Sequence, residues 1–184
     1  MMKITFELSD KDLRYFRQVL QKVRKGQSGE NEEMVLGEAQ ALLTEVRDTD
    51  APEFIRNRIS QLGKFIEMLE DKDWRLEGAD RKRVLNALAY FADPDDLIPD
   101  RVPGLGYLDD AIMVELVVQE LRHEIEAYDD FCSFREREAK AHDADTDKLE
   151  ARRKALQARM RRRHRSDRRA RASRRTGRSP LSLW

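Results

Sequence analysis

Residues 84–121 read VLNALAYFADPDDLIPDRVPGLGYLDDAIMVELVVQEL, two apolar helical patterns separated by a loop rich in proline and aspartate. Proline holds the preceding residue in an extended conformation, so Pro94, Pro99 and Pro103 predict that one helix ends just before the loop and another begins just after it. The loop is longer than the usual two to eight residues between bundle helices. Because it also carries apolar residues, we expect a rigid loop that tucks them under the helices.

The rest of residues 1–140 has the same helical period. Apolar residues recur every three or four positions, the spacing that lines one face of a helix. The helices that this spacing predicts cover about 10–26, 31–47, 52–70, 79–92 and 107–140. The sequence therefore predicts an all-α protein, a bundle of about five helices with a long proline/aspartate loop.

Composition excludes several other classes of protein. Of 184 residues 39% are charged and only 7% aromatic, which is typical of long solvated helices. Eight Gly and five Pro leave too few turns for a sandwich or barrel. The sequence shows no apolar run of the roughly 18 residues that span a bilayer and no secretory signal, and the lone Cys132 excludes an intrachain disulfide framework. We therefore expect a cytoplasmic protein.

The net charge of zero is the sum of two oppositely charged parts. Residues 151–184 contain fourteen Lys and Arg against one acid, Asp167, a net +13, which leaves −13 for residues 1–150. We expect an acidic bundle over 1–140, an acidic hinge over 141–150 and an Arg-rich arm over 151–184, helical at first and then disordered. Because arginines spaced by three and four residues repel one another, this helix should be marginal in isolation.

The arm is the strongest functional signal that the residues provide. Guanidinium groups bind phosphate through two parallel hydrogen bonds and stack on bases, so the run predicts binding to RNA, the ribosome or DNA. The candidate residues are Arg159, Arg161, Arg162, Arg163, Arg165, Arg168, Arg169 and Arg171. Two alternatives stay open. The arm could fold back on its own acidic body, or it could hold the protein at an anionic membrane surface, peripheral at the inner face, with Leu181, Leu183 and Trp184 in the interface.

The loop and the residues around it resemble the YkvA-like family, a bacterial domain of unknown function. The matching residues are Ala89, Tyr90, Pro94, Asp96, Leu97, Ile98, Pro99, Asp100, Pro103, Gly106, Tyr107, Leu108, Asp109 and Asp110. The resemblance covers about forty residues and implies no catalytic activity. It does imply an association with membranes, because many members carry more apolar helices beside the loop. Here Glu115, Gln119 and Glu120 interrupt the helix that follows, which argues against insertion into the bilayer.

The carboxylates of the loop raise the question of a metal site. If Asp100, Asp109 and Asp110 converge, they could hold Mg²⁺ or Ca²⁺ and support a metal-dependent hydrolase. We favour a structural role, in which aspartates cap turns and bond to loop amides. The residues assigned to this structural loop are Pro94, Asp96, Pro99, Asp100, Pro103, Gly106, Asp109 and Asp110. Because no acid, base or nucleophile stands near them and the lone His123 is assigned to a helix surface, we predict no catalytic residue and no cofactor, and hence a non-enzymatic binding or adaptor protein.

Overall fold

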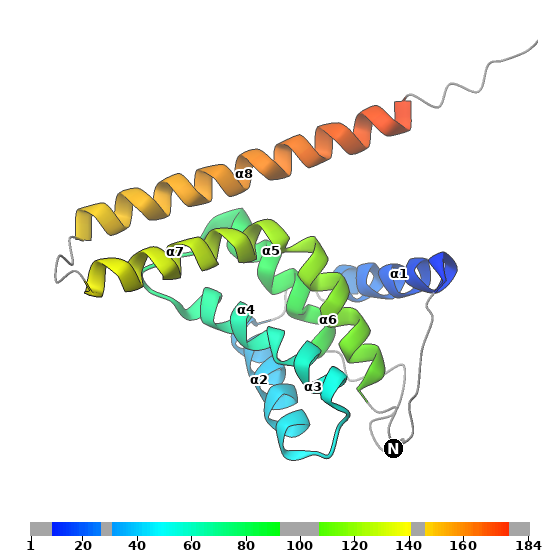
Figure 1. The fold of residues 1–184 in the computed structure, drawn as a ribbon. Coiled ribbons are helices and arrows are strands. Elements are labelled where there is room, and N and C mark those ends of the chain that lie inside the picture. Colours follow the sequence, from blue (N-terminus) through cyan, green and yellow to red (C-terminus); the bar gives the residue numbers. More distant parts are fainter. Residues whose placement is uncertain (1–8, 27–30, 93–106, 141–145, 177–184) are drawn as a thin grey trace, which may run out of the picture. The chain divides into compact units, whose positions relative to one another are not determined.

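The computed structural model describes residues 9–26, 31–92, 107–140 and 146–176, and every regular element in these ranges is helical (Figure 1). In chain order they are α1 (Asp10–Gly26), α2 (Glu32–Asp48), α3 (Glu53–Ile59), α4 (Gln61–Glu70), α5 (Gly78–Leu88), the 3₁₀-helix η1 (Ala89–Ala92), α6 (Leu108–Glu120), α7 (Arg122–Lys140) and α8 (Thr146–Thr176). They form two compact units, unit 1 (Met1–Leu121) and unit 2 (Arg122–Trp184). The predicted all-α class is confirmed.

Unit 1 is a helical bundle in which α2 contacts α3, α4, α5 and η1, while α6 contacts α1, α3 and α4. Apolar side chains from these elements are withdrawn from solvent. The completely buried ones include Ile55, Leu62, Phe65, Met68, Trp74, Val84, Leu88, Met113, Val114 and Val117. The apolar residues that recur over 52–70, namely Ile55, Ile59, Leu62, Ile66 and Leu69, are all buried. The sequence therefore identified the buried face of this segment correctly.

Two of the predicted long helices are each divided at a single residue. Segment 52–70 forms α3 and α4, with Ser60 between them. The Ser60 Oγ donates to the carbonyl of Asn57 (2.9 Å), the local bond by which serine competes with helical hydrogen bonding. Segment 107–140 forms α6 and α7, and Leu121 between them has φ −93° and ψ 16°, away from helical values. These two breaks account for much of the difference from the five predicted helices.

The turn between α4 and α5 is organised by polar side chains. The Asp71 carboxylate accepts the backbone N–H groups of Asp73 (2.9 Å) and Trp74 (3.0 Å), which directs the Trp74 indole into the core. Gly78 begins α5 with φ 58°, a left-handed conformation that costs glycine little. This turn therefore places a buried tryptophan between two helices over only a few residues.

Arg81 of α5 connects three parts of unit 1. Its Nη1 donates to the carbonyls of Leu69 (2.6 Å), near the end of α4, and of Leu76 (3.3 Å), in the following turn. Its Nη2 and Nε donate to the two carboxylate oxygens of Glu32, in the first turn of α2. One guanidinium thus satisfies two carbonyl groups and a carboxylate from separate elements.

Helix α6 begins at a residue with unusual backbone geometry. Tyr107 has φ 64° and ψ 10°, in the left-handed region, where a bulky residue is rare. Its hydroxyl donates to Oε1 of Glu45 on α2 (2.8 Å), and this hydrogen bond ties the start of α6 to α2. The loop before Tyr107, residues 93–106, lies outside the described residues.

The C-terminal part differs from its predicted boundaries. Residues 146–150, predicted to be part of a hinge, form the first turns of α8, while 141–145 lie outside the described residues. Helix α8 continues to Thr176, so residues 173–176, which the sequence predicted to be disordered, are helical, while 177–184 lie outside the described residues. The compact units divide after Leu121 rather than near residue 140, since α7 packs on α8.

Candidate functional site

The Arg-rich helix α8 packs along α7 as an antiparallel hairpin within unit 2 (Figure 1). Few apolar side chains are buried on α8, where Leu156 and Met160 are almost completely withdrawn from solvent. Between the second half of α7 and the start of α8, the Arg152 guanidinium lies over the Phe134 ring, 5.5 Å from its centroid. The small number of buried apolar residues on α8 gives polar pairs a large part in holding the two helices together.

Ion pairs join α7 and α8 at three levels. Arg122 pairs with Asp167 (2.6 Å between Nη2 and Oδ2). One turn further along α7, Glu126 pairs with Arg163. One more turn along, Asp130 pairs with Arg159. We refer to these three pairs as the charge ladder. Arg159 and Arg163, both candidate ligands for an anionic partner, are therefore engaged by carboxylates of the same unit.

Two histidines lie between the two helices, near the start of α7. The Nε2 of His164 lies 2.7 Å from Oε1 of Glu124, and the Nε2 of His123 lies 3.0 Å from Oδ2 of Asp167. The imidazole rings meet edge to face with centroids 5.1 Å apart. Glu124 is 0% exposed, so its carboxyl group requires polar partners within the protein. The sequence assigned His123 to a helix surface. This assignment is wrong, since only 8% of His123 is exposed.

The pKa of Asp167 is held below its ordinary value of 3.8. The hydrogen bond with His123 is the largest cause, and the hydrogen bond and positive charge of Arg122 add to it. A lowered pKa in the folded state means that Asp167 stabilises the hairpin above about pH 3.8, and that this contribution disappears as the pH falls through the folded-state pKa.

We expect Asp167→Asn to lower the melting temperature of the full-length protein near neutral pH and to reduce its sensitivity to acid. The difference in melting temperature between wild type and variant should be largest well above pH 3.8 and should shrink as the pH falls below 3.8 through the lowered pKa of Asp167, where the wild-type carboxylate also becomes protonated. Circular dichroism melts at several pH values would measure it. A difference that stays constant over this range would contradict the pKa argument.

The opposite face of α8 carries exposed arginines. Counting from the buried Met160, the positions that turn away by helical periodicity include Arg161, Arg162, Arg165, Arg168 and Arg169. All five are exposed, and so is Arg171. We refer to the first five, without Arg171, as the outward arginine face. The eight arginines singled out from the sequence thus divide into two that pair with α7 and six that remain exposed.

The carboxylates proposed as metal ligands fall on both sides of the described boundary. Asp100 and the predicted loop residues Pro94, Asp96, Pro99, Pro103 and Gly106 lie outside the described residues. Asp109 and Asp110 are buried in the first turn of α6, where the helix dipole favours negative charge. Asp109 also accepts a long hydrogen bond from the Tyr90 hydroxyl (3.4 Å). Within the described parts of the chain, no group of three or more His, Cys, Asp or Glu side chains is arranged to hold a metal ion.

Sequence reasoning missed the polar centre of the hairpin. The sequence analysis assigns His123 to a helix surface and gives no role to Glu124 or His164. The usable signal was the four-residue spacing on both segments. Glu126 and Asp130 are separated by the same interval as Arg159 and Arg163, which permits antiparallel pairing of the two helices.

Comparison with known proteins locates the chain in a family. A family model described as "Protein of unknown function (DUF1232)" matches residues 82–116, which include most of α5, η1 and the first two turns of α6 but not α8. No solved structure matches the chain significantly.

One curated relative is the "Uncharacterized membrane protein YkvA" of Bacillus subtilis (strain 168). It is 32% identical over 77 residues, which cover 39% of this chain and 71% of that protein. Among the described residues, none of the helices is both long enough and apolar enough to cross a membrane. With this identity over most of that relative, and with the family model falling on the same proline- and aspartate-rich region that resembled it, the chain belongs to the YkvA-like family of unknown function (DUF1232).

Proposed function

We propose that this YkvA-like protein is a non-enzymatic binding protein whose helix α8 binds an anionic polymer, with RNA as the first polymer to test. The observation that carries the proposal is the outward arginine face. When α8 packs on α7, Arg159 and Arg163 turn towards the carboxylates of α7, while the five arginines of the face stay exposed. The single acid of the arm, Asp167, pairs with α7 and leaves this face uniformly positive.

The dimensions of the face suit a phosphate backbone. Arg161 and Arg169 are eight residues apart, which is about 12 Å along a helix. A fixed helix presents guanidiniums at a lower entropic cost than a disordered run does. Contact with six phosphates would give a slope of roughly −4 to −5 when the logarithm of the binding constant is plotted against that of the salt concentration.

The test is a titration of fluorescent single-stranded RNA at several salt concentrations with the full-length protein and two triple variants. The first variant, Arg162→Gln/Arg165→Gln/Arg169→Gln, removes three charges from the outward arginine face. The matched control, Arg14→Gln/Arg17→Gln/Lys22→Gln, removes three exposed charges from α1. Charge variants are preferable to truncation, because removing α8 also exposes the α7 face against which it packs.

We expect the first variant to bind at least about tenfold more weakly near 0.1 M salt and to lose about 2–3 units of salt slope, because each arginine–phosphate contact contributes about 0.7–0.9 units. The control should bind like the wild type. Equal weakening by the two variants, or no salt-dependent binding by the wild type, would rule out α8 as an RNA-binding element.

A second candidate function is peripheral binding to an anionic membrane surface. The observation that favours it is that the relative from Bacillus subtilis is named as a membrane protein. Flotation with vesicles that contain anionic lipid, and with neutral vesicles, uses the same variants. Flotation that needs both anionic lipid and the outward arginine face, together with failure to bind RNA, would replace the first candidate with the second.

A further inference from the structure

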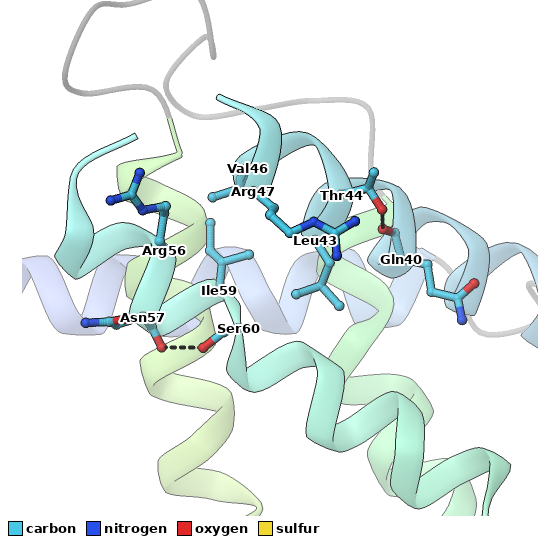
Figure 2. Close-up of a pocket in the computed structure, with 9 residues that line it drawn as sticks. All are labelled: Gln40, Leu43, Thr44, Val46, Arg47, Arg56, Asn57, Ile59 and Ser60. Carbon is cyan, nitrogen blue, oxygen red and sulfur yellow. Dashed lines mark hydrogen bonds between the residues drawn. The ribbon is translucent and has the colours of Figure 1, made fainter. Parts of the chain in front are cut away.

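A groove lies between the second half of α2 and α3 in unit 1 (Figure 2). Its volume of about 630 Å³ falls within the range of about 300–1,000 Å³ that is usual for small-molecule sites. Three apolar residues line it: Leu43 of α2 is partly exposed, whereas Val46 of α2 and Ile59 of α3 are almost completely buried. Both helices belong to the same compact unit and contact each other, so the groove is a feature of unit 1 alone.

The charged residues that line the groove are both arginines. Arg47 comes from α2 and Arg56 from α3, and no acidic side chain is among the described residues that line the groove. In Figure 2 the two arginines stand on either side of Ile59. The Arg47 side chain is 76% exposed and lies 3.8 Å from the equally open Asp48, a surface pair of little strength. Residues 1–150 carry a net charge of −13, whereas the charged residues among the described lining of the groove are two arginines. The groove is thus positive within a negatively charged part of the chain.

The neutral polar groups of the lining leave hydrogen-bond donors for an anion. Thr44 and Ser60 donate their hydroxyl protons to the backbone carbonyls of Gln40 (3.0 Å) and Asn57 (2.9 Å), so these protons are already used and the donors for an anion come from other groups. The side-chain amides of Gln40 and Asn57 carry N–H donors on the same lining. With the two guanidiniums, the donor set is matched to a group of oxygen acceptors, and phosphate and carboxylate are the groups with that chemistry.

From this lining we infer that the groove binds an amphipathic anion, a phosphate or carboxylate headgroup attached to an apolar chain. The headgroup pairs with one of the two exposed guanidiniums that flank the groove, Arg47 or Arg56, and the chain lies along the partly exposed Leu43. The site is separate from the outward arginine face, and it involves no residue of unit 2.

Calorimetric titration of the full-length protein tests the inference with soluble probes below their micelle concentrations: octyl phosphate and octanoate, with inorganic phosphate and octanol as partial probes. We expect both amphipathic anions to bind at least tenfold more tightly than either partial probe. Across butyl, hexyl and octyl phosphate, affinity should rise by up to about fourfold per methylene group that becomes buried.

The variants separate the two parts of the site. Either Arg47→Gln or Arg56→Gln should weaken octyl phosphate about fivefold or more and leave octanol unchanged, whereas Leu43→Gln, at a partly exposed position, should flatten the dependence on chain length. Arg17→Gln on α1 is the matched control and should have no effect. Equal affinity for inorganic phosphate and octyl phosphate, or equal weakening by Arg17→Gln, would overturn the inference. So would binding of phosphatidic acid vesicles without binding of the soluble amphiphiles, since the membrane surface would then be the ligand.

Discussion

Replacing Glu124 with alanine is expected to accelerate amide hydrogen exchange throughout α8 by roughly 10²-fold, the largest effect that we predict for any single residue of unit 2. Glu124 is completely buried on α7, and its Oε1 lies 2.7 Å from Nε2 of His164, itself only 16% exposed. Glu124→Ala empties a completely buried position and removes the carboxylate that lies against His164, a loss of about 2–4 kcal/mol. Since Leu156 and Met160 are the buried apolar residues of α8, little else would offset that loss.

Glu126→Ala is the matched control for this prediction. Glu126 lies on the same helix and also pairs with α8, through Arg163, but its side chain is 53% exposed. Exposed pairs contribute at most about 1 kcal/mol, so exchange in α8 should change less than about fivefold. Glu124→Gln, which keeps the volume and one acceptor oxygen, should fall between the two. Equal acceleration by Glu124→Ala and Glu126→Ala, measured by mass spectrometry on the full-length protein, would show that burial does not govern the strength of these pairs.

Replacing Arg81 with methionine is expected to lower the free energy of unfolding of unit 1 by about 2–4 kcal/mol. The change keeps an apolar stem but removes the donors to the carbonyls of Leu69 and Leu76 and to the carboxylate of Glu32. A part-buried carbonyl that loses a charged donor costs about 1–3 kcal/mol, and two are affected here. Urea titration followed by circular dichroism would measure the loss.

The neighbouring Lys82 provides the control, because Lys82→Met removes the same charge from an exposed position and should change the stability by less than about 0.5 kcal/mol. Arg81→Lys should recover only part of the loss, since one ammonium lacks the planar fork that reaches both carbonyls and the carboxylate together. Full recovery by lysine would indicate that charge alone, and not the geometry of the guanidinium, stabilises this junction.

The apolar pattern predicted most of the helical structure because burial follows periodicity. The stripe through Ile55, Ile59 and Leu62 identifies the face of α3 and α4 that enters the core. The same pattern could not locate the breaks at Ser60 and Leu121, because a helix can be interrupted without changing which side chains are buried. Such breaks depend on backbone geometry at one residue, for which the apolar spacing carries no signal.

The candidate functional surfaces were only partly predictable. The arginine run was evident, but the sequence treated its charges as equivalent and its helix as marginal. The structure distinguishes Arg159 and Arg163, which lie against Asp130 and Glu126, from the arginines that face away. The groove beside Arg47 could not be predicted, because it depends on how two separate helices meet.

The charge ladder also determines the alignment of α7 against α8. Two of its pairs place an acid on α7 and an arginine on α8, whereas the pair between Arg122 and Asp167 has the opposite polarity. If α8 slid by one turn in one direction, Arg122 would meet Arg163. If it slid by one turn in the other, Asp167 would meet Glu126. A ladder of uniform polarity would permit either displacement. The one inverted pair therefore fixes the register of α8 against α7, and with it the position of every outward arginine along the hairpin.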